Sequence, residues 1–203
     1  MRRTLWIPVL LAACGDVKDP MNADEMPVDA LTLMSGSHSF EFITAGNPRL
    51  PYNFTTGIKL TQPVPNPTDS NGLVVIDCTN ATTVMGFNCA SNRALIPDGV
   101  KFLAMANVGA SGRFIEFTFP ADIVELSIAV STATGAAHTY AFTAFDAAGA
   151  NVASAMVQTG PLSGWAANRA SLAVQSGFRQ ARITNVGAIG DVIVLDHLRW
   201  TAR

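Results

Sequence analysis

Few residues of this sequence have the spacing of known catalytic motifs. The chain contains no HExxH, GxSxG, phosphate-binding P-loop or GxGxxG pattern. Ser111 and Ser163 stand beside glycines, but a nucleophilic serine needs a sharp strand-to-helix turn, and no helix is predicted after either. His38, His138 and His197 are far apart in the sequence. Because a catalytic triad assembles in space, a triad stays open, although surface or rim histidines are the simpler interpretation.

The most specific chemistry is predicted at the amino terminus. Two arginines precede an apolar run over residues 5–13, which suits a signal peptide and is too short to span a bilayer. Leu11-Ala12-Ala13-Cys14 stands at the end of this run and resembles the lipobox of bacterial lipoproteins. That resemblance implies cleavage before Cys14 and acylation of its sulfur and amino group, which would anchor the chain in a membrane. An ordinary secretory signal, with Cys14 incidental, is the alternative.

The composition predicts a folded body of nearly neutral charge. Of 203 residues, 49% are apolar and 14% are charged, which excludes a chain that is disordered overall. The net charge of −2 argues against a surface that coats nucleic acid. Residues 15–30 carry five acids and one lysine without apolar periodicity. We therefore expect a signal peptide at 1–13, a lipidated acidic tether at 14–30 and one domain at 31–203.

Short strands account for most of the pattern in residues 31–203. Apolar Val124, Leu126, Ile128 and Val130 alternate with small or polar residues, which predicts a strand with one buried face. Pro120 is expected to end the strand before it. Further strands are predicted at 39–44, 57–61, 73–77, 115–119, in a hairpin at 140–157, and in a pair formed by 178–186 and 192–200. No long amphipathic helix is predicted, so the fold class is all-β, an antiparallel two-sheet β-sandwich.

Cys78 and Cys89 form an even pair once Cys14 is set aside. In an exported chain such a pair favours a structural disulfide. A bridge that closes a loop of about twelve residues contributes on the order of 3 kcal/mol to stability. A metal or redox pair is the alternative, but ten intervening residues match no CxxC pattern and no histidine lies near.

Three segments of the chain carry a resemblance to a known family: Ser39-Phe40-Glu41-Phe42, residues 140–149, and Val194-Leu195-Asp196-His197-Leu198-Arg199-Trp200. They resemble jelly-roll sandwiches that are similar to carbohydrate-binding modules of secreted and surface-anchored bacterial proteins. The resemblance spans roughly residues 37–201. It implies a jelly-roll-like architecture and says little about the ligand, because fold and function are separable.

The resemblance also implies a candidate calcium site at Glu41 and Asp196. These acids fall on the first and last predicted strands, which are often neighbours in such sandwiches, where a structural calcium ion is common. Calcium takes about six to eight oxygen ligands, so backbone carbonyls would have to complete the set. The alternative is that both are sheet-edge or buried, hydrogen-bonded acids. Asp146, in the predicted hairpin turn, is expected to accept hydrogen bonds from its own backbone.

Aromatic residues are the platforms expected in a sandwich that binds sugars, because pyranose rings stack on them. Trp165 lies in a glycine-containing loop and is expected to be partly exposed, with Asn168 and Arg169 close behind. Tyr52, between Pro51 and Asn53, is the second candidate platform. The alternative is that both rings cover the edge of the core.

Together these features favour a non-catalytic lipoprotein that faces the periplasm or the cell exterior and binds a glycan or another envelope component. Nucleic acid is not an expected partner. The alternative is a jelly-roll polysaccharide lyase or hydrolase, in which Glu116, Glu125, Asp146 or His138 converge on a groove. A purely structural or adhesive lipoprotein with a protein partner is the third hypothesis.

Overall fold

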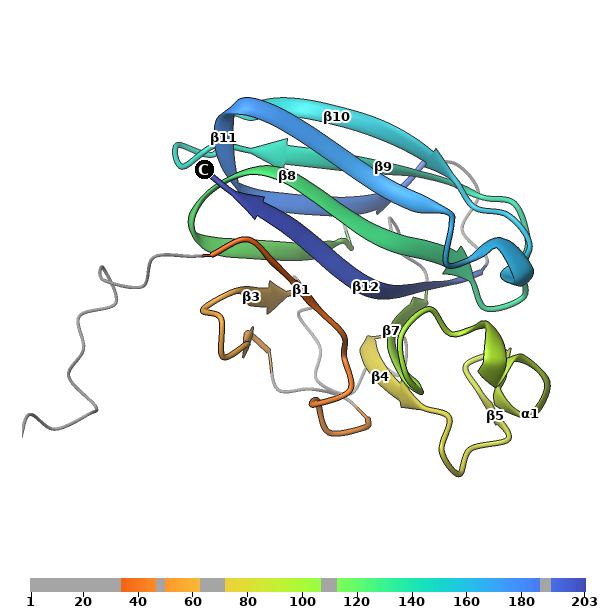
Figure 1. Cartoon of the computed structure of the whole chain (residues 1–203). Coiled ribbons are helices and arrows are strands. Elements are labelled where there is room, and N and C mark those ends of the chain that lie inside the picture. Colours follow the sequence, from red (N-terminus) through yellow and green to blue (C-terminus); the bar gives the residue numbers. More distant parts are fainter. Residues whose placement is uncertain (1–33, 47–49, 63–71, 107–112, 187–190) are drawn as a thin grey trace, which may run out of the picture. The chain divides into compact units, whose positions relative to one another are not determined.

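Antiparallel strands make up most of the domain (Figure 1). The computed structural model describes residues 34–46, 50–62, 72–106, 113–186 and 191–203. Every strand pairing among these residues is antiparallel. The predicted signal peptide, Cys14 and the acidic tether lie outside the described residues, as does Ser111. No helix within the described ranges is long and apolar enough to cross a membrane.

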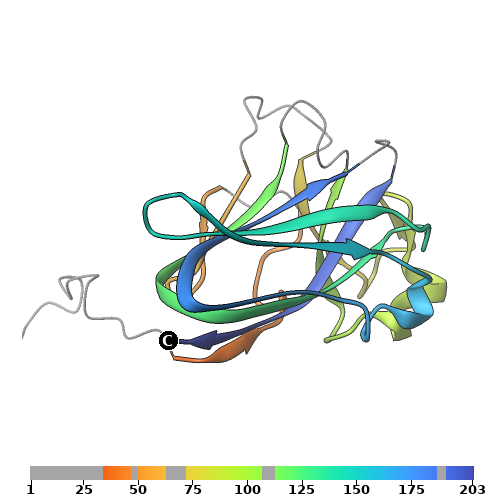
Figure 2. The same cartoon turned by 90° about the horizontal axis from the view of Figure 1, so that it is seen from above.

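Hydrogen bonds join the main strands into one sheet that folds over into two layers. The first layer contains β2 (Tyr52–Asn53), β3 (Lys59–Thr61), β9 (Thr139–Phe145) and β10 (Asn151–Gln158). The second layer contains β1 (Gly36–His38), β4 (Leu73–Asp77), β7 (Lys101–Ala106) and β12 (Val192–Ala202). Two long strands, β8 (Ile115–Thr132) and β11 (Arg169–Asn185), run through both layers and curve together at one end (Figure 2).

Strand β8 changes layers at a bend around Pro120. Before the bend it pairs with β3 and with the second half of β11, and after it with the first half of β11 and with β12. Its ladder pairs stop at Thr118 and resume at Ile123, so the missing N–H of Pro120 removes no ladder bond. The prediction that Pro120 ends the strand is therefore wrong, because the strand bends there and continues.

Two further strand predictions are wrong. Residues 39–44 contain a turn, because Phe40 and Ile43 are both buried and the Ile43 N–H donates to the Phe40 carbonyl at 3.1 Å. Strands β11 and β12 do not pair with each other, because they lie on opposite edges of β8. The predicted strands at 57–61 and 73–77 and the hairpin at 140–157 are confirmed.

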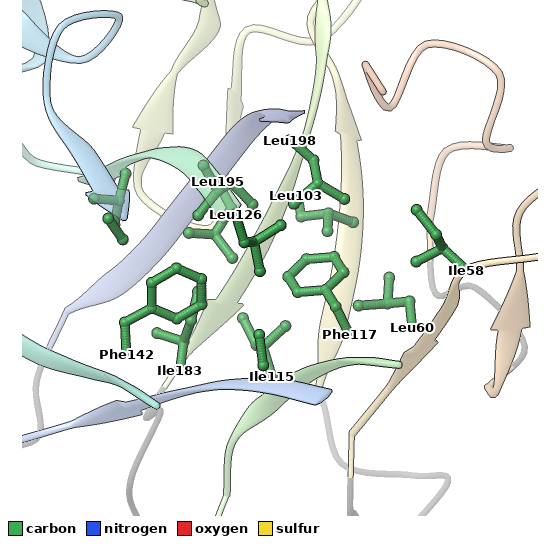
Figure 3. Close-up of a cluster of buried hydrophobic side chains, with 14 of the residues drawn as sticks. Ile58, Leu60, Leu103, Ile115, Phe117, Leu126, Phe142, Ile183, Leu195 and Leu198 are labelled. Carbon is green, nitrogen blue, oxygen red and sulfur yellow. The ribbon is translucent and has the colours of Figure 1, made fainter. Parts of the chain in front are cut away.

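The main hydrophobic core lies between the two layers (Figure 3). It forms because apolar residues at every second strand position point to the same side of each layer. Side chains from both layers meet there, including Leu60, Ile115, Phe117, Phe142 and Ile183 from the first and Leu103, Leu126, Leu195 and Leu198 from the second. This packing confirms the predicted all-β sandwich.

A second buried cluster lies on the other face of the second layer. Strand β7 is buried on both faces, because Leu103 and Met105 join the main core whereas Phe102 and Ala104 join the second cluster. The residues that cover this cluster come from two segments, 78–96 and 162–165. The second layer is therefore coated on part of its outer face and open on the rest.

The segment that follows β4 is closed by a disulfide. It contains the hairpin of β5 (Thr83–Val84) and β6 (Phe87–Asn88), then the short helix α1 (Cys89–Asn92). The predicted bridge between Cys78 and Cys89 is confirmed, and both cysteines are buried in the second cluster. The bridge holds this segment against the outer face of the second layer.

Candidate functional site

An open groove of about 820 Å³ lies on the uncovered part of the second layer. Its lining comes from β1, β8, β11 and β12. These strands alternate, so apolar side chains such as Leu126 and Leu172 are buried while their polar neighbours are partly or fully exposed. The polar side chains that line the groove are Ser37, Glu125, Ser127, Ser171, His197, Arg199 and Thr201.

The strand register arranges these side chains in rows across the groove. Ser171 is opposite Ser127, Ser127 is opposite Arg199, and Arg199 is opposite Ser37. In the next row Glu125 is opposite Thr201. Because neighbouring strands are about 4.8 Å apart, the rows offer hydrogen-bonding groups at regular intervals.

Arg199 and Glu125 carry the charges on the groove surface. The Glu125 carboxylate accepts a hydrogen bond from the Thr201 hydroxyl at 3.0 Å. Arg199 donates through Nε to Nε2 of His197 at 3.0 Å, which requires a neutral imidazole with its proton on Nδ1. Within the described residues Arg199 has no carboxylate at ion-pair distance.

His197 occupies a β-bulge at one end of the groove. It is one of the non-glycine residues with a positive φ, 51°, and the pairing between β12 and β8 shifts between Asp196 and Arg199. Arg169 fixes this bulge, because its Nη2 donates to the His197 carbonyl at 2.6 Å and its Nε donates to the Ser127 hydroxyl at 3.2 Å. Burial, and next the charges of Arg199 and Arg169, lower the pKa of His197.

Asp196 lies beneath this bulge and is fully buried. One carboxylate oxygen accepts the Asp98 N–H at 2.8 Å and the other accepts the His197 N–H at 2.7 Å. Burial raises the pKa of Asp196 to about 7, and the nearby Asp98 and Glu41 carboxyls act in the same direction. Asp196 is thus a buried, hydrogen-bonded acid.

Glu41 lies in the turn after β1 and reaches the same segment as Asp196. Its Oε1 accepts the Val100 N–H at 2.6 Å and also the Lys101 N–H. The Lys101 ammonium donates to the carbonyls of Glu41 and Ile43 at 2.9 and 3.2 Å. Glu41 is therefore not on the first strand, as predicted, although it does lie near Asp196.

Hydrogen-bond donors engage the oxygens at the predicted calcium site. Carboxylate oxygens of Glu41 and Asp196 accept backbone N–H groups, and the Lys101 ammonium binds the carbonyls of Glu41 and Ile43. Among the described residues, no group of three or more His, Cys, Asp or Glu side chains is placed to hold a metal ion. The hydrogen-bonded alternative describes both acids, and calcium binding stays a prediction that the structure does not test.

Trp165 is fully buried, so the prediction of an exposed platform is wrong. The loop between β10 and β11 folds over the outer face of the second layer, where Trp165 packs edge-to-face against Phe102 and Phe87, with ring centroids 5.2 and 5.9 Å apart. The glycines of this loop indicate a turn in the sequence. Because the loop folds back onto the sheet, the indole is buried in the second cluster. Trp165 is a core residue, which is the alternative that the sequence left open.

Asn168, Tyr52 and Arg169 are not assembled around a common ligand site. The Asn168 amide donates to the carbonyls of Val130 and Gln158 at 3.0 and 3.3 Å, which ties the loop to the sheet. Tyr52 lies in the first layer and packs against the Phe54 ring at 5.1 Å. Arg169 donates hydrogen bonds to two residues that line the groove, Ser127 and His197.

The acids of the enzyme hypothesis do not converge. Glu116 lies on the first-layer half of β8 and pairs with Arg182 at 2.8 Å. Asp146 accepts two backbone N–H groups of its own turn, as predicted. Glu125 lines the groove, whereas Glu116, Asp146 and His138 do not.

The three histidines are also separated. The His38 ring packs edge-on against Phe54 at 4.3 Å, and burial lowers its pKa. His138 lies 3.9 Å from the Asp191 carboxylate, and His197 contacts Arg199 in the bulge. Within the described residues they do not form a triad.

Most residues that line the groove are not predicted as site residues from the sequence. The alternation that predicts the strand at 124–130 already places Glu125 and Ser127 on the polar face. Ser37, Ser171 and Arg199 join them through pairings between segments far apart in the chain. No local pattern in the sequence carries those pairings.

Comparison with known proteins identifies the fold. No protein-family model and no curated sequence matches the chain. A DUF4465 family protein from Bacteroides caccae is 10% identical, with 96% of this chain and 99% of that chain covered and a TM-score of 0.51.

Two further solved structures come from carbohydrate-active proteins. An arabinose-bound α-L-arabinofuranosidase is 10% identical over 83% of this chain and 26% of its own, with a TM-score of 0.50. A carbohydrate-binding module in complex with β-1,4-galactotriose is 14% identical over 79% of this chain and 100% of its own, with a TM-score of 0.43. At 10% identity, the likeness to the DUF4465 protein and to the arabinofuranosidase concerns the fold alone.

Proposed function

We propose that this chain is a non-catalytic glycan-binding module whose ligand lies in the groove of the second layer. The observation that carries the proposal is the polar lining of an open groove by four adjacent strands. Sugar hydroxyls both donate and accept hydrogen bonds. Serine and threonine hydroxyls, the Arg199 N–H groups and the Glu125 carboxylate supply both kinds of partner.

Binding is favoured over hydrolysis by the arrangement of the acids. Glycoside hydrolysis needs a pair of carboxyl groups about 5 to 10 Å apart across the scissile bond. Among the described residues that line the groove, Glu125 is the one carboxylate. Asp196 is fully buried beneath the sheet, where its oxygens bind backbone N–H groups. A single exposed acid suits recognition of a hydroxyl group.

The proposal includes display at the bacterial cell envelope through a lipid on Cys14. The basis is the apolar run before Leu11-Ala12-Ala13-Cys14, and the disulfide between Cys78 and Cys89 agrees with an oxidising compartment. Metabolic labelling with a palmitate analogue tests the anchor. We expect labelling of the wild type and none of Cys14→Ser. An unlabelled wild type would remove the anchor and leave the groove unaffected.

A glycan array tests binding at the groove. Ser171 and Ser154 are both exposed serines on strands, but Ser171 lines the groove whereas Ser154 lies on β10 in the first layer. We expect Ser171→Trp to weaken binding at least tenfold because the indole fills the groove, and Ser154→Trp to bind like the wild type. Equal thermal unfolding of the variants would show that both are folded. Binding to no glycan, or equal binding by the two variants, would contradict the proposal.

A further inference from the structure

We infer that the groove recognises an anionic substituent on its glycan, a carboxylate or a sulfate, through Arg199. This inference rests on the proposed function, because it names the class of glycan that the same groove binds. The observations that carry it are the position of Arg199, the contacts that orient its guanidinium, and the absence of an acid partner for it among the described residues.

Arg199 stands in the groove with its guanidinium available. It is exposed, and it lies in the row that also contains Ser37, Ser127 and Ser171. Its Nε donates to His197, which fixes the plane of the group. Two terminal nitrogens with four N–H donors remain, and this planar pair matches a carboxylate or a sulfate in a two-point contact.

Three other described arginines, Arg179, Arg182 and Arg203, have carboxylate partners, whereas Arg169 donates to carbonyl and hydroxyl oxygens. Arg182 pairs with Glu116 at 2.8 Å, and Arg179 pairs with Asp122 at 2.9 Å. No carboxylate lies within ion-pair distance of Arg199 in the described part of the chain. The groove acid, Glu125, binds the Thr201 hydroxyl. A ligand anion would supply the partner that the protein does not.

The surroundings of Arg199 add positive charge. Arg169 lies close enough for Arg199 to lower its pKa, after the larger effect of burial, and it contacts the same bulge. The acids facing this bulge are Asp98 and Asp196, and Asp196 turns its oxygens toward backbone N–H groups. Two guanidinium groups therefore stand near the His197 bulge, where their charge favours an anion, and the groove also carries the Glu125 carboxylate.

The net charge of the whole chain distinguishes recognition of an anion by Arg199 from a general attraction to polyanions. The net charge is −2, so the molecule as a whole does not attract anions. A preference for acidic glycans would have to come from the groove. Neutralising Arg199 should therefore abolish the preference for acidic glycans. Neutralising an arginine far from the groove should leave that preference unchanged.

The experiment measures binding of the full chain to two matched pairs of polysaccharides. One pair is polygalacturonate and its carboxyl-reduced form, and the other is a sulfated galactan and its desulfated form. The variants are Arg199→Gln and, as a control of equal charge, Arg179→Gln, whose parent arginine is exposed on β11 outside the groove. The first pair reports a carboxylate and the second a sulfate.

We expect one anionic polymer to bind at least tenfold more tightly than its neutral form. Arg199→Gln should reduce this binding to the level of the neutral form, and Arg179→Gln should leave it unchanged. Equal loss in both variants would show non-specific charge attraction and would overturn the inference. Equal binding of anionic and neutral forms, abolished by Ser171→Trp, would overturn the inference and leave the proposed function standing. If Ser171→Trp abolishes none of the observed binding, the inference and the proposed function are both overturned.

Discussion

At the scale of single residues, Gly99 shows how the Glu41 turn is held. Its φ is +77°, and a Cβ atom at this position would overlap the Glu41 carboxylate. That carboxylate accepts the next two backbone N–H groups, of Val100 and Lys101. The glycine is thus required both by its backbone conformation and by the close approach of Glu41.

Gly99→Ala should lower the free energy of unfolding by about 3 kcal/mol or more, because it adds backbone strain and displaces the Glu41 hydrogen bonds. Gly149→Ala is the control, since Gly149 has a φ of +82° but nothing within 4 Å of the added methyl. Gly149→Ala should lower the free energy of unfolding by about 1 to 2 kcal/mol. Urea denaturation compares the two. Equal losses would show that the contact with Glu41 is unimportant.

Phe40 and Phe42 provide a second comparison within one turn. Phe40 is fully buried in the main core, whereas Phe42 is 88% exposed. Phe40→Ala should cost about 3 to 5 kcal/mol of stability, and Phe42→Ala should change it by less than about 0.5 kcal/mol. Thermal unfolding measures both. A large loss in Phe42→Ala would mean that the turn is packed differently.

Asp196 should make stability depend on pH. Its pKa is raised to about 7 in the folded chain from an unfolded value of 3.8, so the unfolded state ionises first. The stability that the protonated carboxyl contributes is complete below pH 3.8 and is lost as the pH rises to about 7, at up to about 1.4 kcal/mol per pH unit.

The test compares wild type with Asp196→Asn between pH 4 and 8 in the presence of a calcium chelator. The amide cannot ionise, so the stability of wild type relative to the variant should fall as the pH rises. The histidines with lowered pKa, His38 and His197, act in the opposite direction but are common to both proteins. A difference that stays constant across this range would contradict the burial of an ionisable Asp196.

At the scale of elements, the sequence predicts strands better than it predicts their partners. The alternation at 124–130 and the hairpin turn at Asp146 are local patterns, and both predicted elements are present. The pairing of 178–186 with 192–200 was expected because they are consecutive, but β8 lies between them. Phe40 and Phe42 alternate with polar residues as in a strand, but the structure buries Phe40 and Ile43 and exposes Phe42, because a turn forms there.

The segment closed by the disulfide is the element whose contribution is easiest to measure. Cys78→Ser should lower the free energy of unfolding by on the order of 3 kcal/mol, the value for a closed loop of about twelve residues. The Cys78→Ser/Cys89→Ser double variant should lose no more, because the bridge is already absent in the single variant. Guanidinium denaturation without reductant gives the comparison. Stability that does not change in either variant would contradict a formed bridge.

At the scale of the whole molecule, the groove is a product of topology. Its polar residues come from positions 37, 125–127, 171 and 197–201, which the two bent strands, β12 and β1 bring together. Each segment alone is an ordinary amphipathic strand. The sandwich class can therefore be predicted from the sequence, but the groove cannot. The sequence indicates Trp165 as a candidate ligand residue, although the structure buries it in the core.

The most direct measurement is a crystal structure of the protein with the glycan that binds it most tightly on the array. The account predicts the sugar over β11, β8 and β12, with Ser127, Ser171 and Arg199 in contact with it. A glycan bound to the first layer, or at the loop that buries Trp165, would contradict the account.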